Sequence, residues 1–275
     1  IHCLTQGVIL DVVPLDSLLM PDLQAYQALL ALKPKVVSLT QVSNALGHIL
    51  PLQQMLSAAK AAGAITIVDG AQGIAWQVPD LQQYPADFYC FSGHKLYGPT
   101  GIGVLYGMKV HLERLPTYNG GGVMISVVST EGVTYNDPPH RFEAGTPPIV
   151  QAIGLGHALD YIEGLGREAI AAHEESLRAY AHERLSAINS LRIIGNAPGK
   201  GAIFSFELAG IHAHDVSTMI DRRGVAVRAG THCAQPLLAR FGVTSTCRAS
   251  FGLYNTREEV DALADALDYA RSFFA

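Results

Sequence analysis

The chain has 275 residues and a formal net charge of −5, with 49% hydrophobic and only 16% charged residues. So low a charged fraction excludes a disordered protein. A negative charge without a basic stripe argues against a nucleic-acid partner, and no apolar run reaches the roughly 18 residues of a membrane-spanning helix. The chain is long enough for one large α/β domain or two unequal ones, and its low charge favours an oligomer.

Apolar, β-branched segments alternate with helical segments over the first half of the chain. This alternation predicts right-handed crossovers and a mostly parallel sheet with helices on both faces. We expect strands over residues 8–12, 36–40, 65–69, 87–92 and 102–106 and helices over residues 15–32 and 52–62. Pro51 opens the second of these helices and Gly63 closes it.

Residues 107–148 differ in character, because they hold three consecutive glycines and several prolines with little periodicity. A stretch of this length predicts a functional or interface loop rather than a linker. Beyond it we expect helices over 149–163, 167–188, 213–223 and 256–274, with strands over 191–194, 202–208, 225–228 and 247–251. The second half therefore reads as a separate α+β unit.

The segment Ser92-Gly93-His94-Lys95 follows a predicted strand and precedes a glycine-rich turn. The carboxyl ends of strands are where open α/β sheets bind ligands. A lysine placed against apolar strands would be desolvated, which would lower its pKa and make its amine nucleophilic. For an isolated string of these residues, an ordinary surface lysine is the simpler interpretation.

Asp69 ends another predicted strand, and Gln72 follows it closely. A carboxylate there can meet a cationic ring nitrogen, and pyridoxal phosphate needs such a carboxylate together with a lysine. An aspartate at a strand end is often only a helix N-cap. Asp69 and Lys95 at the same edge of the sheet favour the cofactor.

The cysteines Cys3, Cys90, Cys233 and Cys247 are scattered, without a CxxC pair or a zinc-like spacing. We therefore expect no metal site and a reducing, cytoplasmic location. Cys233 differs from a core cysteine because it lies in a loop of small residues beside His232 and close to Arg228, which favours its thiolate form. Arg248, on a late strand, suits bidentate binding of a carboxylate, although a structural ion pair is commoner.

Five motifs, in this order and spacing, resemble one family: DGAQ at 69–72, SGHKLYGPTGIG at 92–103, RFEAGTP at 141–147, RAGTHCAQP at 228–236 and RASFGLYNT at 248–256. They resemble the class V, fold-type I pyridoxal-phosphate (PLP) enzymes, specifically the group II cysteine desulfurases of the SUF type. The resemblance implies a mostly parallel, seven-stranded-type PLP-transferase large domain, here partial, over residues 1–160. A smaller α+β domain would span residues 161–275. The family's first phosphate-binding turn and ring-stacking histidine lie upstream of Ile1, so we expect that an N-terminal segment is missing.

The resemblance implies a role for each cofactor-binding residue. Lys95 matches the Schiff-base lysine, Asp69 the partner of the ring nitrogen, and Gln72 the contact to the phenolic oxygen. Ser92 and His94 match phosphate ligands, and His94, beside the lysine, is also counted among the catalytic residues.

It also implies the substrate-binding residues. Asn44 matches a residue that faces both the cofactor and the substrate carboxylate, Arg248 matches the carboxylate-binding arginine, and Arg228 supports it. Cys233 matches the nucleophile that takes the sulfur. Thr146 matches a residue that reaches the phosphate of the neighbouring subunit, so a homodimer would share its active sites.

The implied reaction converts L-cysteine to L-alanine and leaves a persulfide on Cys233 for iron–sulfur cluster assembly, which requires a sulfur-acceptor protein, either an activator or a scaffold. Two other functions remain open. A selenocysteine lyase, or another class V lyase or transaminase, would keep the cofactor and change the reaction. A sulfur-carrier or scaffold protein would have lost the cofactor altogether.

Overall fold

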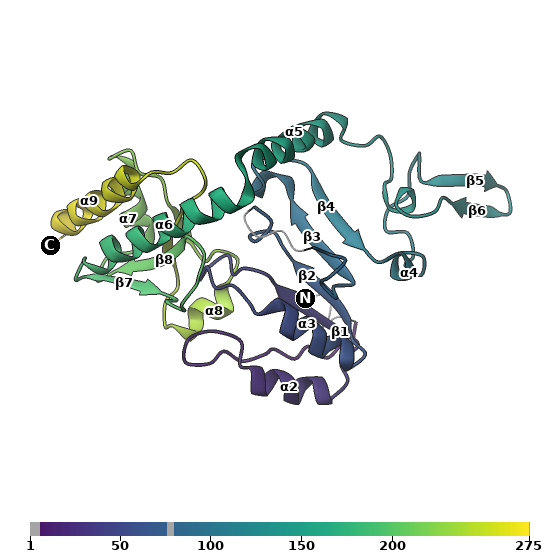
Figure 1. Cartoon of the computed structure of the whole chain (residues 1–275), viewed down its shortest axis with the longest axis horizontal. Helices are drawn as coiled ribbons and strands as arrows, with labels where there is room; N and C mark the ends of the chain where they lie inside the picture. Colours follow the sequence, from purple (N-terminus) through teal and green to yellow (C-terminus); the bar gives the residue numbers. More distant parts are fainter. Residues whose placement is uncertain (1–5, 76–79, 275) are drawn as a thin grey trace. The chain divides into compact units, whose positions relative to one another are not determined.

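The computed structural model describes residues 6–75 and 80–274 of the chain (Figure 1). Its contacts divide the chain into two compact units. Unit 1 consists of Ile1–Leu29, Val42–Leu50 and Arg167–Ala275, and unit 2 of Leu30–Gln41 and Pro51–Gly166. This division differs from the expected boundary after residue 160, because it falls at Gly166 and because two N-terminal segments group with the C-terminal half. None of the described helices is both long and apolar enough to cross a membrane.

Unit 2 is built on a four-stranded sheet in the order β1-β2-β3-β4. The strands are β1 (Val36–Thr40), β2 (Ile65–Asp69), β3 (Phe88–Ser92) and β4 (Gly103–Gly107). The first three are parallel and β4 is antiparallel to β3. The expected α/β fold with a mostly parallel sheet is confirmed, and parallel pairing brings the carboxyl ends of β2 and β3 to one edge of the sheet.

The helices of unit 2 are α3 (Leu52–Ala61), α4 (Lys109–Leu112) and α5 (Ile149–Leu165), with short 3₁₀ turns η1 (Gly93–Lys95) and η2 (His140–Phe142). Helix α3 follows Pro51 and buries Leu52, Met55, Leu56 and Ala59. Gly63 closes it with a φ of 82°, as its position predicted. The segment expected to be an irregular loop contains a hairpin of β5 (Ile125–Ser129) and β6 (Gly132–Tyr135).

A fully buried carboxylate, Asp87, precedes β3. It accepts hydrogen bonds from Lys60 Nζ at 2.5 Å, from the backbone N and Oγ1 of Thr66 at 2.8 and 3.0 Å, and from His111 Nε2 at 2.9 Å. These donors outweigh the cost of burial and lower the pKa of Asp87. The network links α3, β2 and α4 to the start of the strand that ends at Ser92.

Unit 1 contains an antiparallel sheet in the order β7-β8-β10-β9. Its strands are β7 (Leu191–Ile194), β8 (Ile203–Leu208), β9 (Arg228–Gly230) and β10 (Thr246–Ser250), and its helices are α6 (Arg167–Ser186), α7 (Ala213–Asp221), α8 (Gln235–Arg240) and α9 (Arg257–Phe274). Helix α2 (Leu23–Ala31) includes the passage to unit 2. The core joins α6, α7 and α9 to the sheet through large apolar residues such as Phe204, Phe206 and Leu267.

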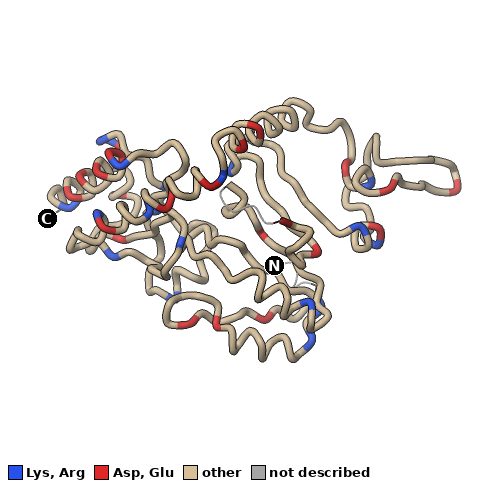
Figure 2. The backbone as a smooth tube through the Cα atoms, in the orientation of Figure 1, with Lys and Arg blue, Asp and Glu red and all other residues tan. Residues whose placement is uncertain are grey.

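Acidic and basic residues are interspersed along α6, whereas the charged residues of α9 are mostly acidic (Figure 2). Asp261 of α9 accepts a hydrogen bond from Tyr180 Oη at 2.8 Å and one from Arg184 Nε at 2.6 Å, both on α6. Surface pairs of this kind contribute little stability. These hydrogen bonds instead set the alignment of α6 with α9, which also pack together through the apolar core.

Two predictions near the N-terminus are wrong. Residues 8–12 do not form a strand, and Val8, Ile9, Leu10 and Val12 are between 52% and 86% exposed, because no described strand pairs with them. The helix expected over residues 15–32 begins only at Leu23. Asp22 Oδ1 accepts the backbone N–H groups of Gln24 and Ala25, an N-cap contact that sets this start.

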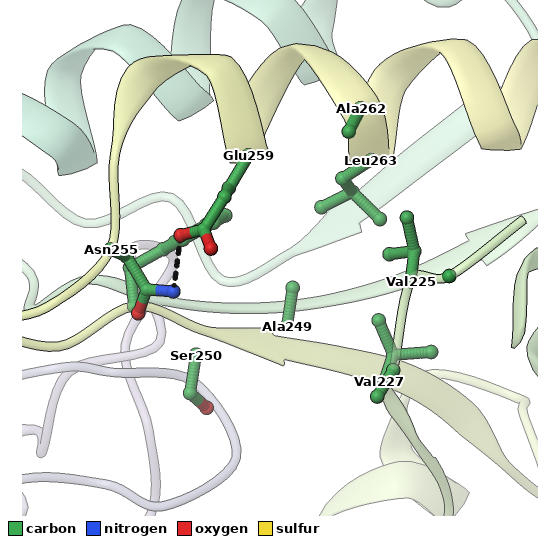
Figure 3. Close-up of a pocket in the computed structure, with 11 residues that line it drawn as sticks. Val225, Val227, Ala249, Ser250, Asn255, Glu259, Ala262 and Leu263 are labelled. Carbon is green, nitrogen blue, oxygen red and sulfur yellow. Dashed lines mark hydrogen bonds between the residues drawn. The ribbon is translucent and has the colours of Figure 1, made fainter.

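The strand predicted over residues 225–228 is displaced, since β9 begins at Arg228. The pairing of β9 with β10 ends at Arg228 and Arg248, and residues 225–227 diverge to line a hollow of about 170 Å³ (Figure 3). The carboxylate that lines it is already engaged, because Glu259 accepts hydrogen bonds from Asn255 Nδ2 at 2.8 Å and from Thr256 N at 3.0 Å. The remaining predicted elements shift by at most two residues at their ends. Besides the hairpin, the short helices α4 and α8 were not predicted.

Candidate functional site

The first half of the predicted site lies at the carboxyl edge of the sheet in unit 2. Strands β2 and β3 pair directly, with Asp69 opposite Cys90 and therefore two residues before the level of Ser92. The side chain of Asp69 is exposed, and its Oδ1 accepts the N–H of Ala71 at 2.9 Å. This asx-turn contact orients the carboxylate, which fits both the cofactor interpretation and the simpler cap interpretation.

The turn after Asp69 lies tightly against Tyr89 and Gln41. A Cβ atom on Gly70 would come within 2.0 Å of the Tyr89 ring, and one on Gly73 within 2.3 Å of the Gln41 side chain. Tyr89 is only 2% exposed and donates its hydroxyl to Gln41 Oε1 at 2.6 Å. Burial, with smaller contributions from Asp69 and other neighbours, raises the pKa of Tyr89, so the phenol stays protonated.

The segment Ser92–Lys95 forms the next part of this edge. Gly93 is buried, donates its N–H to Ile102 O at 2.9 Å and accepts the N–H of Gly98 at 3.0 Å. His94 and Lys95 project from this fixed backbone and are exposed. The described residues therefore do not bury Lys95, and the expected desolvation of its amine by this chain is not present.

Thr146 lies on the loop before α5 and is exposed. The preceding Gly145 has a φ of 86° and donates its N–H to Gly122 O at 2.9 Å, which fixes the loop locally. Its predicted reach to a second subunit stays a prediction.

The second half of the predicted site belongs to unit 1 and centres on Cys233. Its thiol is free and exposed, in a four-residue turn between β9 and α8. His232 and Cys233 both have left-handed backbone, with φ of 52° and 57°. Non-glycine residues adopt this conformation at a cost, so the surroundings must hold it. Cys247, by contrast, is buried, and burial raises its pKa to about 12.

His232 does not act as predicted from its position next to the thiol. Its ring is 1% exposed, and burial, followed by the positive charge of Arg248, lowers its pKa to about 4. The imidazole is neutral at physiological pH and supplies no cation to the thiolate. The positive charge near Cys233 comes from the arginines, and Cys233 partly offsets the lowering of the Arg248 pKa that burial and Arg228 cause.

Arg228 and Arg248 stand directly opposite each other on β9 and β10. Directly opposed residues of an antiparallel pair share one face of the sheet, and like charges there repel. An anionic ligand between them would relieve this repulsion. The pair suits an anion such as a carboxylate, and its predicted role in substrate binding stays a prediction.

Asn44 joins Cys233 and Arg248 in unit 1, although it is far from both in sequence. Its Nδ2 donates to His232 O at 2.7 Å, and its backbone O accepts Arg248 Nη1 at 2.9 Å. The segment around it is anchored by Ser205 Oγ, which donates to Ala45 O at 2.5 Å. The structure thus brings Asn44, Cys233 and Arg248 together.

The residues of unit 2 fit a pyridine cofactor with an anionic tail. A carboxylate, an imidazole and a primary amine, all exposed, lie at the ends of adjacent parallel strands. Asp69 suits a ring nitrogen, Lys95 a carbonyl carbon, and Ser92 and His94 a phosphate.

Sequence reasoning missed the residues that support these side chains. Tyr89 and Gln41 lie beneath the Asp69 turn, and Thr246 lies beneath His232. The only signal in the sequence was the pair Gly70 and Gly73, which indicates close backbone approach without naming the partner.

Known proteins resemble this chain over most of its length. The sequence profile of the aminotransferase class-V family matches residues 2–263. A probable cysteine desulfurase of Streptomyces coelicolor is 48% identical over 255 residues, 92% of this chain, and a cysteine desulfurase of Dickeya dadantii is 48% identical over 263 residues, 95% of this chain. The crystal structure of the cysteine desulfurase CsdA of Escherichia coli, in an S-sulfonic acid form, superposes with a TM-score of 0.94 at 39% identity, covering 98% of this chain and 67% of that one.

The chain spans about three fifths of the length of these two curated relatives, 61% and 64% respectively.

Proposed function

Because the chain belongs to the aminotransferase class-V family, whose members depend on PLP, we propose that its protein is a cysteine desulfurase. The proposed reaction converts L-cysteine to L-alanine and leaves the sulfur on Cys233. The observation that carries the proposal is the exposed Cys233 thiol, held in a left-handed turn beside an arginine pair that suits a carboxylate. The curated cysteine desulfurases at 48% identity support it.

The chain's own residues divide the work as follows. Arg248 and Arg228 bind the substrate carboxylate, and Asn44 holds Arg248 through its carbonyl oxygen. Lys95 would hold the cofactor and move the α-proton, and Asp69 would keep a proton on the ring nitrogen. PLP, when bound, supplies an electron sink next to the α-carbon.

In the sulfur-transfer step, Cys233 accepts the sulfur atom of the substrate. Its thiolate attacks the substrate sulfur, an S–S bond forms, and the carbon–sulfur bond of the substrate breaks with its electron pair left on carbon. That carbon takes up a proton and leaves as L-alanine, and Cys233 is left as a persulfide. No external oxidant or reductant is needed.

The test is mass spectrometry of the protein after incubation with L-cysteine, with the cysteines mapped for added sulfur. We expect sulfur on Cys233, none in Cys233→Ala or Lys95→Ala, and unchanged labelling in the control Cys90→Ala. Sulfide release that survives Cys233→Ala and is lost in Lys95→Ala would refute the persulfide step.

Two experiments separate the alternatives. A selenocysteine lyase would keep selenide release in Cys233→Ala, because selenium leaves more readily than sulfur. A cofactor-free carrier protein would show no absorbance band of a lysine-bound cofactor and no change on borohydride treatment, whereas we expect a band that borohydride removes.

We further propose the SUF-type, group II assignment and a role in iron–sulfur cluster assembly in the cytoplasm. The turn that carries Cys233 has only four residues, so it is too short to carry sulfur outward by a large movement. An acceptor protein, an activator or a scaffold, must therefore reach the thiol. A reducing compartment keeps such a thiol free.

We also propose a homodimer in which Thr146 reaches the cofactor phosphate of the second subunit. Exposed apolar side chains on the hairpin and at the start of α5, among them Val127, Val128, Val150 and Ile153, support an interface there. Sedimentation analysis tests it: we expect a dimer for the native chain and a shift toward monomer for Val150→Glu.

A further inference from the structure

His232 is a buried histidine that the proposed reaction does not use. Its Nε2 lies 2.8 Å from Thr246 Oγ1 and 3.1 Å from Thr246 O. A backbone carbonyl can only accept, so Nε2 carries the proton and donates. The other ring nitrogen, Nδ1, is therefore a bare acceptor.

Arg248 Nε is a donor that, like this acceptor, has no hydrogen-bond partner among the described residues. Among the described residues, His232 Nδ1 and Arg248 Nε are both buried side-chain atoms without a hydrogen-bond partner. One is an acceptor and the other a donor, and the Arg248 charge acts on the His232 ring. An unpaired buried polar atom costs about 1–3 kcal/mol, so both atoms favour a partner.

The backbone of His232 completes a closed chain of hydrogen bonds. Its carbonyl oxygen accepts Asn44 Nδ2, the carbonyl oxygen of Asn44 accepts Arg248 Nη1, and Arg248 stands two residues after Thr246 on β10. His232 thus contacts β10 through its ring and Asn44 through its backbone. The next residue is Cys233, in the strained left-handed turn.

We infer that His232 is a positioning residue, which holds the left-handed turn of Cys233 in place and ties it to the carboxylate-binding Arg248. The inference rests on the proposed function, because it concerns the nucleophile and substrate arginine of that reaction. The contact of His232 Nε2 with Thr246 carries this role, because it joins the imidazole ring to strand β10. Without it the Cys233 turn relaxes and Arg248 loses a neighbour.

The test compares His232→Ala, His232→Gln and the native full chain loaded with PLP. Glutamine can place an N–H where Nε2 stands and keep the bond to Thr246; alanine cannot. We expect faster hydrogen–deuterium exchange over residues 231–234, kcat for L-cysteine at least tenfold lower and KM about threefold higher in His232→Ala. We expect His232→Gln to stay within threefold of native in all three. His214→Ala, at an exposed histidine of the same unit, is the matched control and should behave as native.

Native exchange and kinetics in His232→Ala would overturn the inference, as would a His232→Gln variant as impaired as His232→Ala. Should His232→Ala fail to fold, His232→Phe decides. It fills the space of the ring and removes both ring nitrogens, so unchanged exchange over residues 231–234 in this variant would overturn the inference. Exchange is measured without substrate. If it changes as expected while the native chain forms no persulfide, the proposed function fails and the positioning role stands.

Discussion

Gly70 is the position where one added methyl group should disturb the cofactor edge most. An alanine Cβ would come within 2.0 Å of Tyr89 Cζ and Oη, whereas ordinary contacts begin at 3.4 Å. The overlap is therefore about 1.4 Å against a ring that is 2% exposed and held by Gln41. Because the ring has no room to turn, the Asp69–Gly73 turn must move.

The cost follows from this overlap. Overpacking of a well-filled core costs about 1–3 kcal/mol, which in a chain of this size lowers the melting temperature by roughly 2–12 °C. Displacement of a catalytic group by about 1 Å can cost on the order of 100-fold in rate. We therefore expect Gly70→Ala to fold, to bind PLP at least tenfold more weakly and to lose about 100-fold in desulfurase activity.

The assay is titration of the apoprotein with PLP, followed by absorbance, alongside thermal unfolding. Gly164→Ala is the matched control, since a Cβ there meets nothing within 4 Å; it should bind PLP as native and be equally or more stable. Tyr89→Leu in the Gly70→Ala background should restore part of the affinity by removing the ring. Native PLP affinity in Gly70→Ala would refute the argument that Tyr89 supports the Asp69 turn.

Three further predictions concern buried titratable groups. Asp87→Asn should destabilise the fold by about 3 kcal/mol in denaturant unfolding, because it leaves the donors around it without a carboxylate; in the native chain this contribution is lost as pH falls below about 4. Burial, followed by the charge of Arg248, lowers the pKa of His232 to about 4, so its neutral form stabilises the fold above pH 6.5, and roughly 3 kcal/mol is lost as pH falls from 6.5 to 4. Melting curves should show this loss in the native chain and not in His232→Gln. Finally, iodoacetamide at pH 7 should label exposed Cys233 and spare Cys247, whose pKa burial raises to about 12; equal labelling would contradict the assigned burial.

The buried strands could be predicted from the sequence because their pattern is local. β1 and β2 begin and end as the β-branched runs over residues 36–40 and 65–69 indicated. Residues 8–12 carry the same pattern and form no strand, since a strand also needs a neighbour, which composition does not reveal. The hairpin of β5 and β6 was missed because its valines are exposed on both faces and give no buried alternation.

The candidate site likewise has a part that local pattern predicts and a part that depends on distant contacts. Asp69, Ser92 and Lys95 were predicted to share one edge because each follows a strand, and parallel pairing of β2 and β3 places them there. The hydrogen bond between Asn44 and His232 joins residues that are 188 positions apart in the sequence. The hydrogen bond between Arg248 and Asn44 joins residues that are 204 positions apart. No local pattern encodes such contacts, and the position of His232 beside a thiol favoured another role, that of a group that promotes the thiolate form of Cys233. Its burial is decided by the distant strand β10, so only the folded chain distinguishes a histidine that activates Cys233 from one that holds it in place.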